Sequence, residues 1–221
     1  MTWPPPYPRV PHMPPASGAS RDDLVLGAGA ARTMLTEPVF VEEKLDGANV
    51  MLWRDEAGIQ AATRAGPGGR DRAGQLGPLR AWVAQRTEDL GAMLANGSVL
   101  YAEWLWLHHS VRYDAMPETL IALDLFSHAG GFAPVDDRNR ACSQAGLRTP
   151  PPLFHGLLLT RERLDGLLTT SKFGQAPAEG LVIRLAVPRP GLRLAKVVAP
   201  HFSRRPDSSW SASRERNVLM R

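Results

Sequence analysis

Apolar and polar residues alternate along several short stretches of the chain, the pattern of strands with one buried face. Such stretches lie at residues 39–45, 49–54 and 59–63, separated by the turn sequences Asp46-Gly47 and 55–58. Because short turns favour antiparallel pairing, these three strands are predicted to form a meander. Further strands are predicted at residues 99–104, 119–126, 181–186 and 192–198.

Helical periodicity extends over about residues 75–95, where apolar side chains recur every three or four positions. This spacing predicts one amphipathic helix, and shorter helices are predicted near residues 137–145 and 161–168. The sequence contains no internal repeat and no heptad pattern. Short strands joined by turns, with few helices, predict an α+β fold of mainly antiparallel sheets flanked by helices.

Residues 1–20 contain seven prolines, which fix φ and remove backbone donors. We therefore expect an extended N-terminal arm that either wraps the domain or is partly disordered. Residues 21–221 are expected to form one domain with a basic C-terminal segment, because a chain of this length can bury one sizeable core. Residues 66–74 are rich in glycine and arginine but lack the GxxxxGK[ST] pattern of a Walker loop, so a flexible, substrate-facing loop is expected there.

Composition narrows the class of protein. The single cysteine, Cys142, cannot form an internal disulfide, and no apolar run approaches the about 20 residues that a membrane-spanning helix needs. The proline-rich N-terminus lacks the apolar core of a signal peptide. These features favour a cytoplasmic protein that does not cross a membrane.

The basic charge is concentrated at the C-terminal end of the chain. From Arg184 to Arg221 there are eight arginines and one lysine against Asp207 and Glu215, a net charge of +7. Since the whole chain carries +4, residues 1–183 carry −3. Clustered arginines attract phosphodiester backbones, which suits a nucleic-acid substrate, although a solvated arginine-rich tail has the same composition.

Only three of the 26 basic residues are lysines, and Lys44 is one of them. It lies in the run Glu43-Lys44-Leu45-Asp46-Gly47-Ala48-Asn49. A guanidinium stays protonated and is not a nucleophile, whereas the surroundings of a lysine amine can tune it for attack on an electrophile. Lys44 is therefore a candidate nucleophile; the alternative is an ordinary lysine before an Asp-Gly turn.

Three carboxylates fall within apolar strand segments: Glu103, Asp124 and Glu179. Since burying an unpaired charge costs several kcal/mol, each is expected to meet a cation or a metal ion. Any one of them taken alone is more typical of a structural ion pair. Taken together, they predict a phosphate and metal site with the basic residues Lys44, Arg64 and Lys196.

The order of these short motifs resembles the covalent nucleotidyltransferase superfamily of ligases and capping enzymes. Six elements carry the resemblance: Lys44-Leu-Asp-Gly, Thr63-Arg64-Ala-Gly, Ala102-Glu103-Trp104, Ala122-Leu-Asp124, Glu179-Gly180 and Leu194-Ala-Lys196. Asn49, five residues after Lys44, gives the KxDGxN pattern of the RNA ligase branch. The strings Pro11-His12-Met13-Pro14, 109–113, Met116-Pro117 and 196–202 also resemble small bacterial or phage stand-alone RNA ligases.

The resemblance implies an adenylyltransferase fold, with no evident OB-fold domain, and an ATP-dependent reaction with Mg²⁺ or Mn²⁺. Lys44 would attack the α-phosphate of ATP to form lysyl-AMP. AMP would then pass to an RNA 5′-phosphate, and an RNA 3′-OH would displace it. A free lysine is mostly protonated at neutral pH, so we expect Lys196 and bound metal to lower the pKa of Lys44.

The resemblance also implies roles for the matched positions. Asp46 and Arg64 would contact ribose and substrate phosphate, and Asn49 would position RNA ends. Glu103 and Glu179 would contact the metal or ribose, and Lys44 and Lys196 would be catalytic. The implied nucleotide- and RNA-binding set comprises Glu43, Asp46, Gly47, Asn49, Arg64, Leu123 and Arg193.

Two positions differ from the usual family pattern. Leu123 stands where members commonly place an aromatic residue that stacks on adenine. Leu194 stands at the first of two usual lysine positions, which leaves Arg193 as the available second cation. Side chains alternate along a strand, so Arg193 and Lys196 are predicted to point to opposite faces unless a bulge intervenes.

Two other functions stay open from the sequence. One is a nick ligase for DNA or mixed strands, against which Asn49 argues. The other is a non-catalytic RNA-binding module with the same fold, which Leu123 and Leu194 favour and the retained Lys44 and Lys196 oppose. The sequence leaves open whether the RNA ends belong to a nicked duplex or to single strands, and whether a partner protein supplies further C-terminal contacts.

Overall fold

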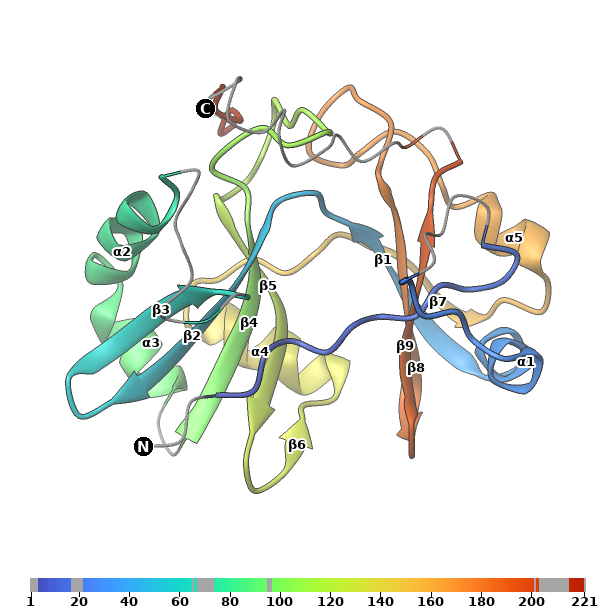
Figure 1. The fold of residues 1–221 in the computed structure, drawn as a ribbon, viewed down its shortest axis with the longest axis horizontal. Helices are drawn as coiled ribbons and strands as arrows, with labels where there is room; N and C mark the ends of the chain where they lie inside the picture. The colour runs from blue at the N-terminus through green and yellow to red at the C-terminus, as the bar shows by residue number, and fades with distance from the viewer. Residues whose placement is uncertain are drawn as a thin grey trace.

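The computed structural model describes residues 4–16, 22–64, 66, 74–94, 97–200, 202 and 215–220. These residues form two antiparallel sheets that stand beside each other, with helices on their outer sides (Figure 1). The predicted α+β class with mainly antiparallel sheets is therefore confirmed. Within the described residues, no helix is long and apolar enough to cross a membrane.

The four-stranded sheet has the order β7 (Pro152–Leu157), β1 (Pro38–Lys44), β8 (Gly180–Arg189) and β9 (Leu192–Val198). Helices α1 (Ala28–Thr36) and α5 (Arg161–Asp165) lie on its outer side (Figure 1). Buried side chains of α1, β1 and β8 form one apolar core there, including Met34, Val39, Val41 and Ile183.

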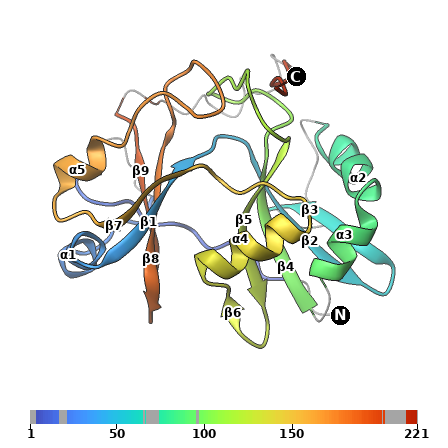
Figure 2. The same ribbon diagram turned by 180° about the vertical axis from the view of Figure 1, so that it is seen from behind.

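The five-stranded sheet has the order β3 (Gly58–Thr63), β2 (Ala48–Asp55), β4 (Ser98–Trp104), β5 (Leu120–Ser127) and β6 (Gly131–Phe132). Helices α2 (Leu76–Ala84) and α3 (Thr87–Met93) lie outside it, and α4 (Val135–Gln144) crosses in front of β4 and β5 in the view from behind (Figure 2). A second apolar core fills the space between these helices and the sheet, including Leu52, Leu79, Leu90 and Trp104.

The prediction of a three-stranded meander is wrong for its first pair of strands. β2 and β3 form a hairpin, in which the carboxylate of Asp55 accepts a 2.9 Å hydrogen bond from the backbone of Ala57 and Gly58 adopts a φ of +109°. β1 does not pair with β2; it pairs with β7 and β8, whereas β2 pairs with β4. The Asp46-Gly47 sequence is therefore the crossing from one sheet to the other rather than a hairpin turn.

Other boundaries also differ from the sequence prediction. The helix predicted over residues 75–95 is two helices, because the chain turns at Gln85 and Arg86 and α3 begins anew with Glu88 and Asp89 in its first turn. Acidic residues favour a helix N-terminus, which explains the restart. The sequence prediction missed both α1 and β7. The glycine-rich loop at 66–74 and the arginines at 204, 205, 214 and 221 lie largely or wholly outside the described residues.

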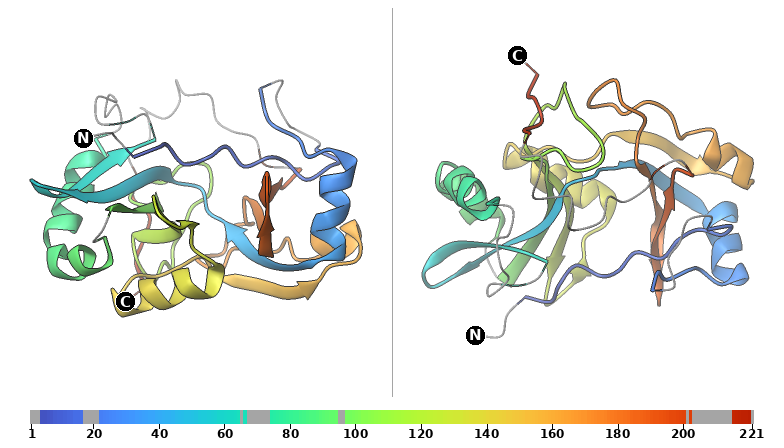
Figure 3. Two further views of the ribbon diagram at one scale, coloured as in Figure 1. Left: turned by 90° about the horizontal axis from the view of Figure 1, so that it is seen from below. Right: turned by 45° about the horizontal axis from the view of Figure 1, so that its top comes forward.

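The N-terminal arm is extended over residues 4–16 and passes from the five-stranded to the four-stranded sheet (Figures 1 and 3). At one end, the carbonyl oxygen of Pro5 accepts a 2.6 Å hydrogen bond from the hydroxyl of Tyr101. At the other end, the arm lies beside β9: Lys196 donates its N–H to Pro11, and Met13 donates its N–H to Lys196, both at 2.8 Å. The arm thus joins the two sheets.

Candidate active site

A cavity of about 370 Å³ lies where the inner faces of the two sheets approach each other. Its lining comes from both sheets and from the N-terminal arm. All the sequence-predicted site residues except Asp124 and Arg193 line it: Glu43, Lys44, Asp46, Gly47, Asn49, Arg64, Glu103, Leu123, Glu179 and Lys196. The fold thus gathers residues that are up to about 150 positions apart around one cavity.

The crossing between β1 and β2 forms one wall of this cavity. Gly47 donates its N–H to Oε1 of Glu103 at 3.0 Å, and Asp46 donates its N–H to the hydroxyl of Tyr113 at 2.7 Å. A Cβ atom on Gly47 would lie 2.7 Å from both the Leu105 side chain and the carbonyl oxygen of Trp104. Glycine is therefore required here because the crossing passes directly against β4 and the residue that follows it.

The carboxylate of Asp46 holds a neighbouring loop in place. Its Oδ2 accepts hydrogen bonds from the backbone N–H groups of Ser110 at 2.6 Å and Val111 at 2.8 Å. That loop is held in turn by Asn217, whose side chain donates to the carbonyls of Leu105 and Leu107 and accepts from the N–H of residue 113. Residues 215–220 therefore support the site from outside the cavity.

Lys44 ends β1 and lies next to β8, where it is the cross-strand partner of Gly180. Its Nζ atom is 2.5 Å from Oε2 of Glu179. Burial alone would lower the pKa of Lys44, but the carboxylates of Glu179 and Glu103 outweigh burial and raise that pKa above its ordinary value. The expectation that Lys196 and bound metal lower this pKa stays a prediction; in the protein alone, the two carboxylates have the larger effect.

Glu103 and Asn49 are directly opposite each other on β4 and β2. Such cross-strand partners stand on the same face of a sheet. Burial raises the pKa of Glu103 to about 7, with the Lys44 ammonium opposing this shift and Glu179 adding to it. The Oδ1 atom of Asn49 is buried and has no hydrogen-bond partner among the described residues. This face therefore presents oxygen atoms that a ligand can engage.

The donor set suits a hard divalent cation. Mg²⁺ binds oxygen, and it commonly uses one or two carboxylates together with water and substrate phosphates. Glu103, Glu179 and the unpaired Oδ1 of Asn49 supply such oxygens beside Lys44. Within the described ranges, no group of three or more His, Cys, Asp or Glu side chains is arranged to hold a metal ion alone. A cation here would thus depend on the substrate for part of its coordination.

Gly180 permits the close pairing of β8 with β9. A Cβ atom at this position would lie 2.0 Å from the carbonyl oxygen of Val197. The same pairing brings Lys196 opposite Val182 on the cavity wall. The Nζ atom of Lys196 is 3.5 Å from Oδ1 of Asp23, which is also 3.5 Å from Nε2 of His12.

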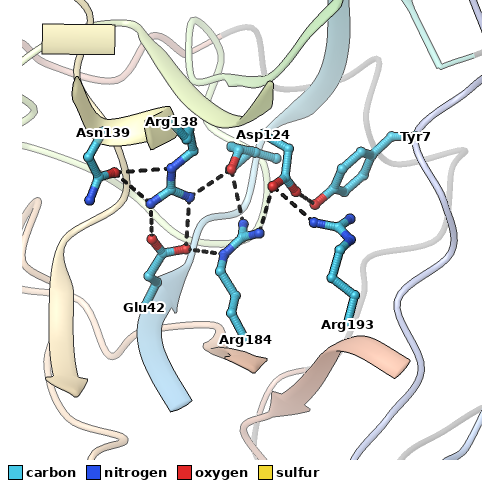
Figure 4. A network of polar contacts seen from close by, with 8 residues as sticks. Tyr7, Glu42, Asp124, Arg138, Asn139, Arg184 and Arg193 are labelled. Atoms are coloured by element: carbon cyan, nitrogen blue, oxygen red, sulfur yellow. Dashed lines mark hydrogen bonds and ion pairs between the residues drawn. The ribbon is translucent and has the colours of Figure 1, made fainter. Parts of the chain in front are cut away.

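Asp124 is not available as a metal ligand, contrary to its place in the predicted phosphate and metal site. Figure 4 shows its carboxylate between Arg184, at 2.8 Å, and Arg193, at 3.0 Å, with the hydroxyl of Tyr7 donating to its other oxygen. Burial would raise the pKa of Asp124, but these two guanidinium groups outweigh burial and lower it. The carboxylate is thus neutralised by the protein itself.

The same ionic network links both sheets (Figure 4), and two of its members, Glu42 and Arg184, line the cavity. Arg184 on β8 contacts Glu42 on β1 at 2.6 Å as well as Asp124 on β5. Arg138 on α4 also pairs with Glu42 and donates to the carbonyl of Leu123 at 2.8 Å. We name Glu42, Asp124, Arg138, Arg184 and Arg193 the inter-sheet network.

Three predicted positions have contacts other than those expected from the motifs. Glu43 accepts hydrogen bonds from the hydroxyl of Ser171 at 2.5 Å and the N–H of Lys172 at 2.8 Å, so its carboxylate is engaged by the protein. Arg64 is exposed at the cavity. Arg193 falls within a register shift between β8 and β9, which allows its guanidinium to reach Asp124 rather than the cavity.

The comparison with protein families decides the relationship. A model of the RNA ligase family matches residues 37–198, which include every motif discussed above from β1 to β9. This chain belongs to the RNA ligase family. The comparison with curated proteins found no match to this chain.

Solved RNA ligases from Naegleria gruberi share the fold of this family member. The form with PPi has a TM-score of 0.54 and 15% identity over 76% of this chain and 51% of that chain. A mutant with ATP and Mn has a TM-score of 0.52 and 14% identity over 82% of this chain and 53% of that chain. A mutant with AMP and Mn has a TM-score of 0.51 and 15% identity over 75% and 51%. This chain spans about half the length of those proteins.

Several residues at this cavity escaped the sequence prediction. Tyr7, Glu42 and Arg184 all line the cavity, and Arg138 completes the network beside it. Glu42 and Arg184 are charged residues inside apolar strands, and this signal could have identified them as candidates. No local signal identifies Tyr7, because its partner Asp124 is 117 residues away.

Proposed function

We propose that this protein is an ATP-dependent RNA ligase that joins RNA 3′-OH and 5′-phosphate ends through a lysyl-AMP intermediate. The observation that carries the proposal is the position of Lys44. Its amine lies in a cavity between two sheets, 2.5 Å from Glu179, with Glu103 and Lys196 on the same walls. Family membership supports the same reaction class.

In the first step, the Lys44 ammonium releases a proton to solvent, and the nitrogen lone pair then attacks the α-phosphorus of ATP. The N–P bond forms as the bond to the bridging oxygen breaks, pyrophosphate leaves, and the nitrogen releases a second proton to solvent. In the resting site, Glu179 and Glu103 hold this amine protonated. Glu103, Glu179 and Asn49 would hold a divalent cation, which would supply positive charge that offsets these carboxylates.

The remaining residues have separate tasks in this step. Lys196 carries a cation on the β9 wall, which suits stabilisation of negative charge that develops on the phosphate oxygens. Asp46 keeps the adjoining loop in position through its two backbone hydrogen bonds. Leu123 and Val182 provide apolar surface for the base.

The second and third steps use the RNA ends. An oxygen of the RNA 5′-phosphate attacks the AMP phosphorus, the P–N bond breaks, and Lys44 takes up two protons from solvent to become an ammonium again. The oxygen of the 3′-OH then attacks the phosphorus of the activated 5′-phosphate; its proton passes to solvent, the bond to the oxygen that bridges to AMP breaks, and AMP leaves. Arg64, exposed at the cavity, and Asn49, with its unpaired oxygen, are proposed to receive these ends. We place the reaction in the cytoplasm.

The proposal is tested by sealing assays with ATP and Mg²⁺ or Mn²⁺ on matched nicked duplexes. The substrates differ only in whether the strands at the nick are RNA, mixed or DNA, and single-stranded RNA is assayed in parallel. Sealing of RNA-terminated ends in preference to DNA supports an RNA ligase. Preferential sealing of all-DNA nicks would assign a DNA ligase instead, and RNA binding with neither adenylylation nor sealing would assign a binding module.

A further inference from the structure

The N-terminal arm forms part of the wall of the cavity that contains Lys44. Tyr7, Pro8 and Val10 line this cavity together with Leu123 and Val182. Four of these five residues, all but Pro8, also belong to one apolar cluster between the sheets. We name the five the apolar wall. Among the residues that line the cavity, Tyr7 supplies the aromatic ring of this wall.

Contacts on three sides fix the Tyr7 ring. Its hydroxyl donates to Asp124, which anchors the ring to the inter-sheet network. The ring centroid is 5.0 Å from that of Tyr101 at an interplanar angle of 45°, and 6.4 Å from that of Phe132 in an edge-on arrangement. Tyr7 is only 8% exposed although it lies on an extended arm. Its position is therefore set before any ligand enters the cavity.

The other end of the arm is fixed at Lys196. Pro11 and Met13 form backbone hydrogen bonds with Lys196 along the outer edge of β9. The arm therefore covers the backbone of Lys196 on that side. Arg161 on α5 then holds the arm by donating to the carbonyls of Met13 at 3.2 Å and Pro14 at 2.6 Å. One segment thus connects the apolar wall with a cation of the proposed phosphate site.

We propose that the arm is a positioning element of the nucleotide site, in which Tyr7 completes the wall that receives the purine base. This inference rests on the proposed function, because it assigns the base end of the same ATP site. A base has apolar faces that bind to aromatic and aliphatic side chains, and a fixed ring provides such a surface with little loss of freedom on binding. The triphosphate then lies toward Lys44 and Lys196.

The first test measures ATP binding without chemistry. ATP is titrated by calorimetry into the full-length Lys44→Ala protein, with and without the added change Tyr7→Ala. We expect the second change to weaken ATP binding about tenfold, within the range for loss of one base–aromatic contact. Tyr7→Phe, which keeps the ring and removes only the hydroxyl, is expected to restore most of the affinity. Unchanged affinity in Tyr7→Ala would overturn the inference.

A matched control separates this role from general packing. Phe126 belongs to the same apolar cluster but does not line the cavity. Phe126→Ala should lower the melting temperature while leaving ATP affinity within about twofold of the parent. Equal weakening of ATP binding by both alanine variants would show a purely structural role for Tyr7. If Tyr7→Ala does not fold, Tyr7→Leu, which keeps most of the side-chain volume, is expected to fold and still bind ATP several-fold more weakly.

Kinetics in the Lys44-containing protein give the second readout. The rate of AMP attachment is followed at increasing ATP, and Tyr7→Ala should raise the half-saturating ATP concentration about tenfold while leaving the maximal rate within about threefold. A fall in maximal rate with unchanged half-saturation would overturn the inference. If the parent binds ATP but never forms an adduct, the proposed function fails, whereas the inference on Tyr7 is still decided by the calorimetric comparison.

Discussion

Lys44 and Glu179 lie 2.5 Å apart, between Nζ and Oε2, although 135 positions separate them in the sequence. The pairing of β1 with β8 causes this contact, because Lys44 is opposite Gly180. The contact keeps the amine charged and in place in the absence of substrate. In the proposed mechanism, nucleophilic attack by Lys44 therefore requires a change in charge around Glu179 and Glu103, which ATP and its cation would supply.

The raised pKa of Glu103 predicts a measurable effect on stability. In the folded protein this pKa is about 7 against an ordinary 4.5, so between these values the unfolded chain has released a proton that the folded chain retains. Stability contributed by this group is therefore complete below pH 4.5 and is lost as the pH rises through 7. We expect Glu103→Gln to be more stable than the parent at pH 8 by about 1–3 kcal/mol.

Urea unfolding at pH 8 and pH 5 checks this expectation. The stability advantage of Glu103→Gln should shrink toward pH 5, where the parent also carries a neutral carboxyl group. The same variant should lose most AMP attachment, because a neutral amide is a weaker metal ligand. A variant that is less stable than the parent at pH 8 would show that the ionised carboxylate stabilises the fold.

Gly47→Ala is predicted to damage the crossing between the sheets. The added methyl group would lie 2.7 Å from the backbone oxygen of Trp104 and from the Leu105 side chain. Because one of these neighbours is backbone, relief requires the crossing to move, at a cost of about 1–3 kcal/mol. Since Lys44 and Asn49 flank this crossing, AMP attachment should fall at least about tenfold if the activation barrier rises by as little as 1.4 kcal/mol.

Gly77→Ala is the matched control for that substitution. Gly77 lies in α2, and a Cβ atom there would meet nothing within 4 Å. This change should leave AMP attachment unchanged and be neutral or stabilising by up to about 1 kcal/mol. Thermal melting and adduct formation are measured for both variants. A Gly47→Ala protein as active as Gly77→Ala would contradict the tight crossing.

Arg184→Met is predicted to be strongly destabilising. Arg184 is buried between Glu42 and Asp124, so its loss leaves two buried carboxylates with fewer cations. Breaking a buried ion pair by removing one partner costs about 3–5 kcal/mol. The exposed pair of Arg140 and Asp137 is the control, and Arg140→Met should change stability by less than about 1 kcal/mol. Denaturant unfolding measures the stability of both variants. A small loss of stability in Arg184→Met, similar to that in Arg140→Met, would show that water stabilises the charges of Glu42 and Asp124.

Much of the fold was predictable because strand periodicity is local. Alternating residues identified most of the strands, whereas β7 carries Pro152 and Gly156 and has no regular alternation of burial. The sheet to which each strand belongs was not predictable, since the pairing of β1 with β8 depends on residues about 140 positions apart. A short Asp-Gly sequence also looks the same in a hairpin and in a crossing between sheets.

The candidate site was predictable as a set of positions but less so in its electrostatics. Short motifs indicated Lys44, Glu103 and Glu179, and the fold brings these three residues to one cavity. The sequence could not reveal that arginines from two different elements neutralise Asp124, or that carboxylates rather than cations dominate around Lys44. Such shifts depend on distance and burial, which arise only when the two sheets come together.

The identity of the nucleophile is tested by mass spectrometry after incubation with ATP and Mg²⁺ and removal of any AMP attached during expression. Lys172, an exposed lysine outside the cavity, supplies the matched control. We predict one AMP adduct in the parent and in Lys172→Ala, located on Lys44 by peptide mapping, and none in a folded Lys44→Ala protein. AMP attachment in Lys44→Ala, or an adduct mapped to another residue, would contradict the assignment of Lys44 as the nucleophile.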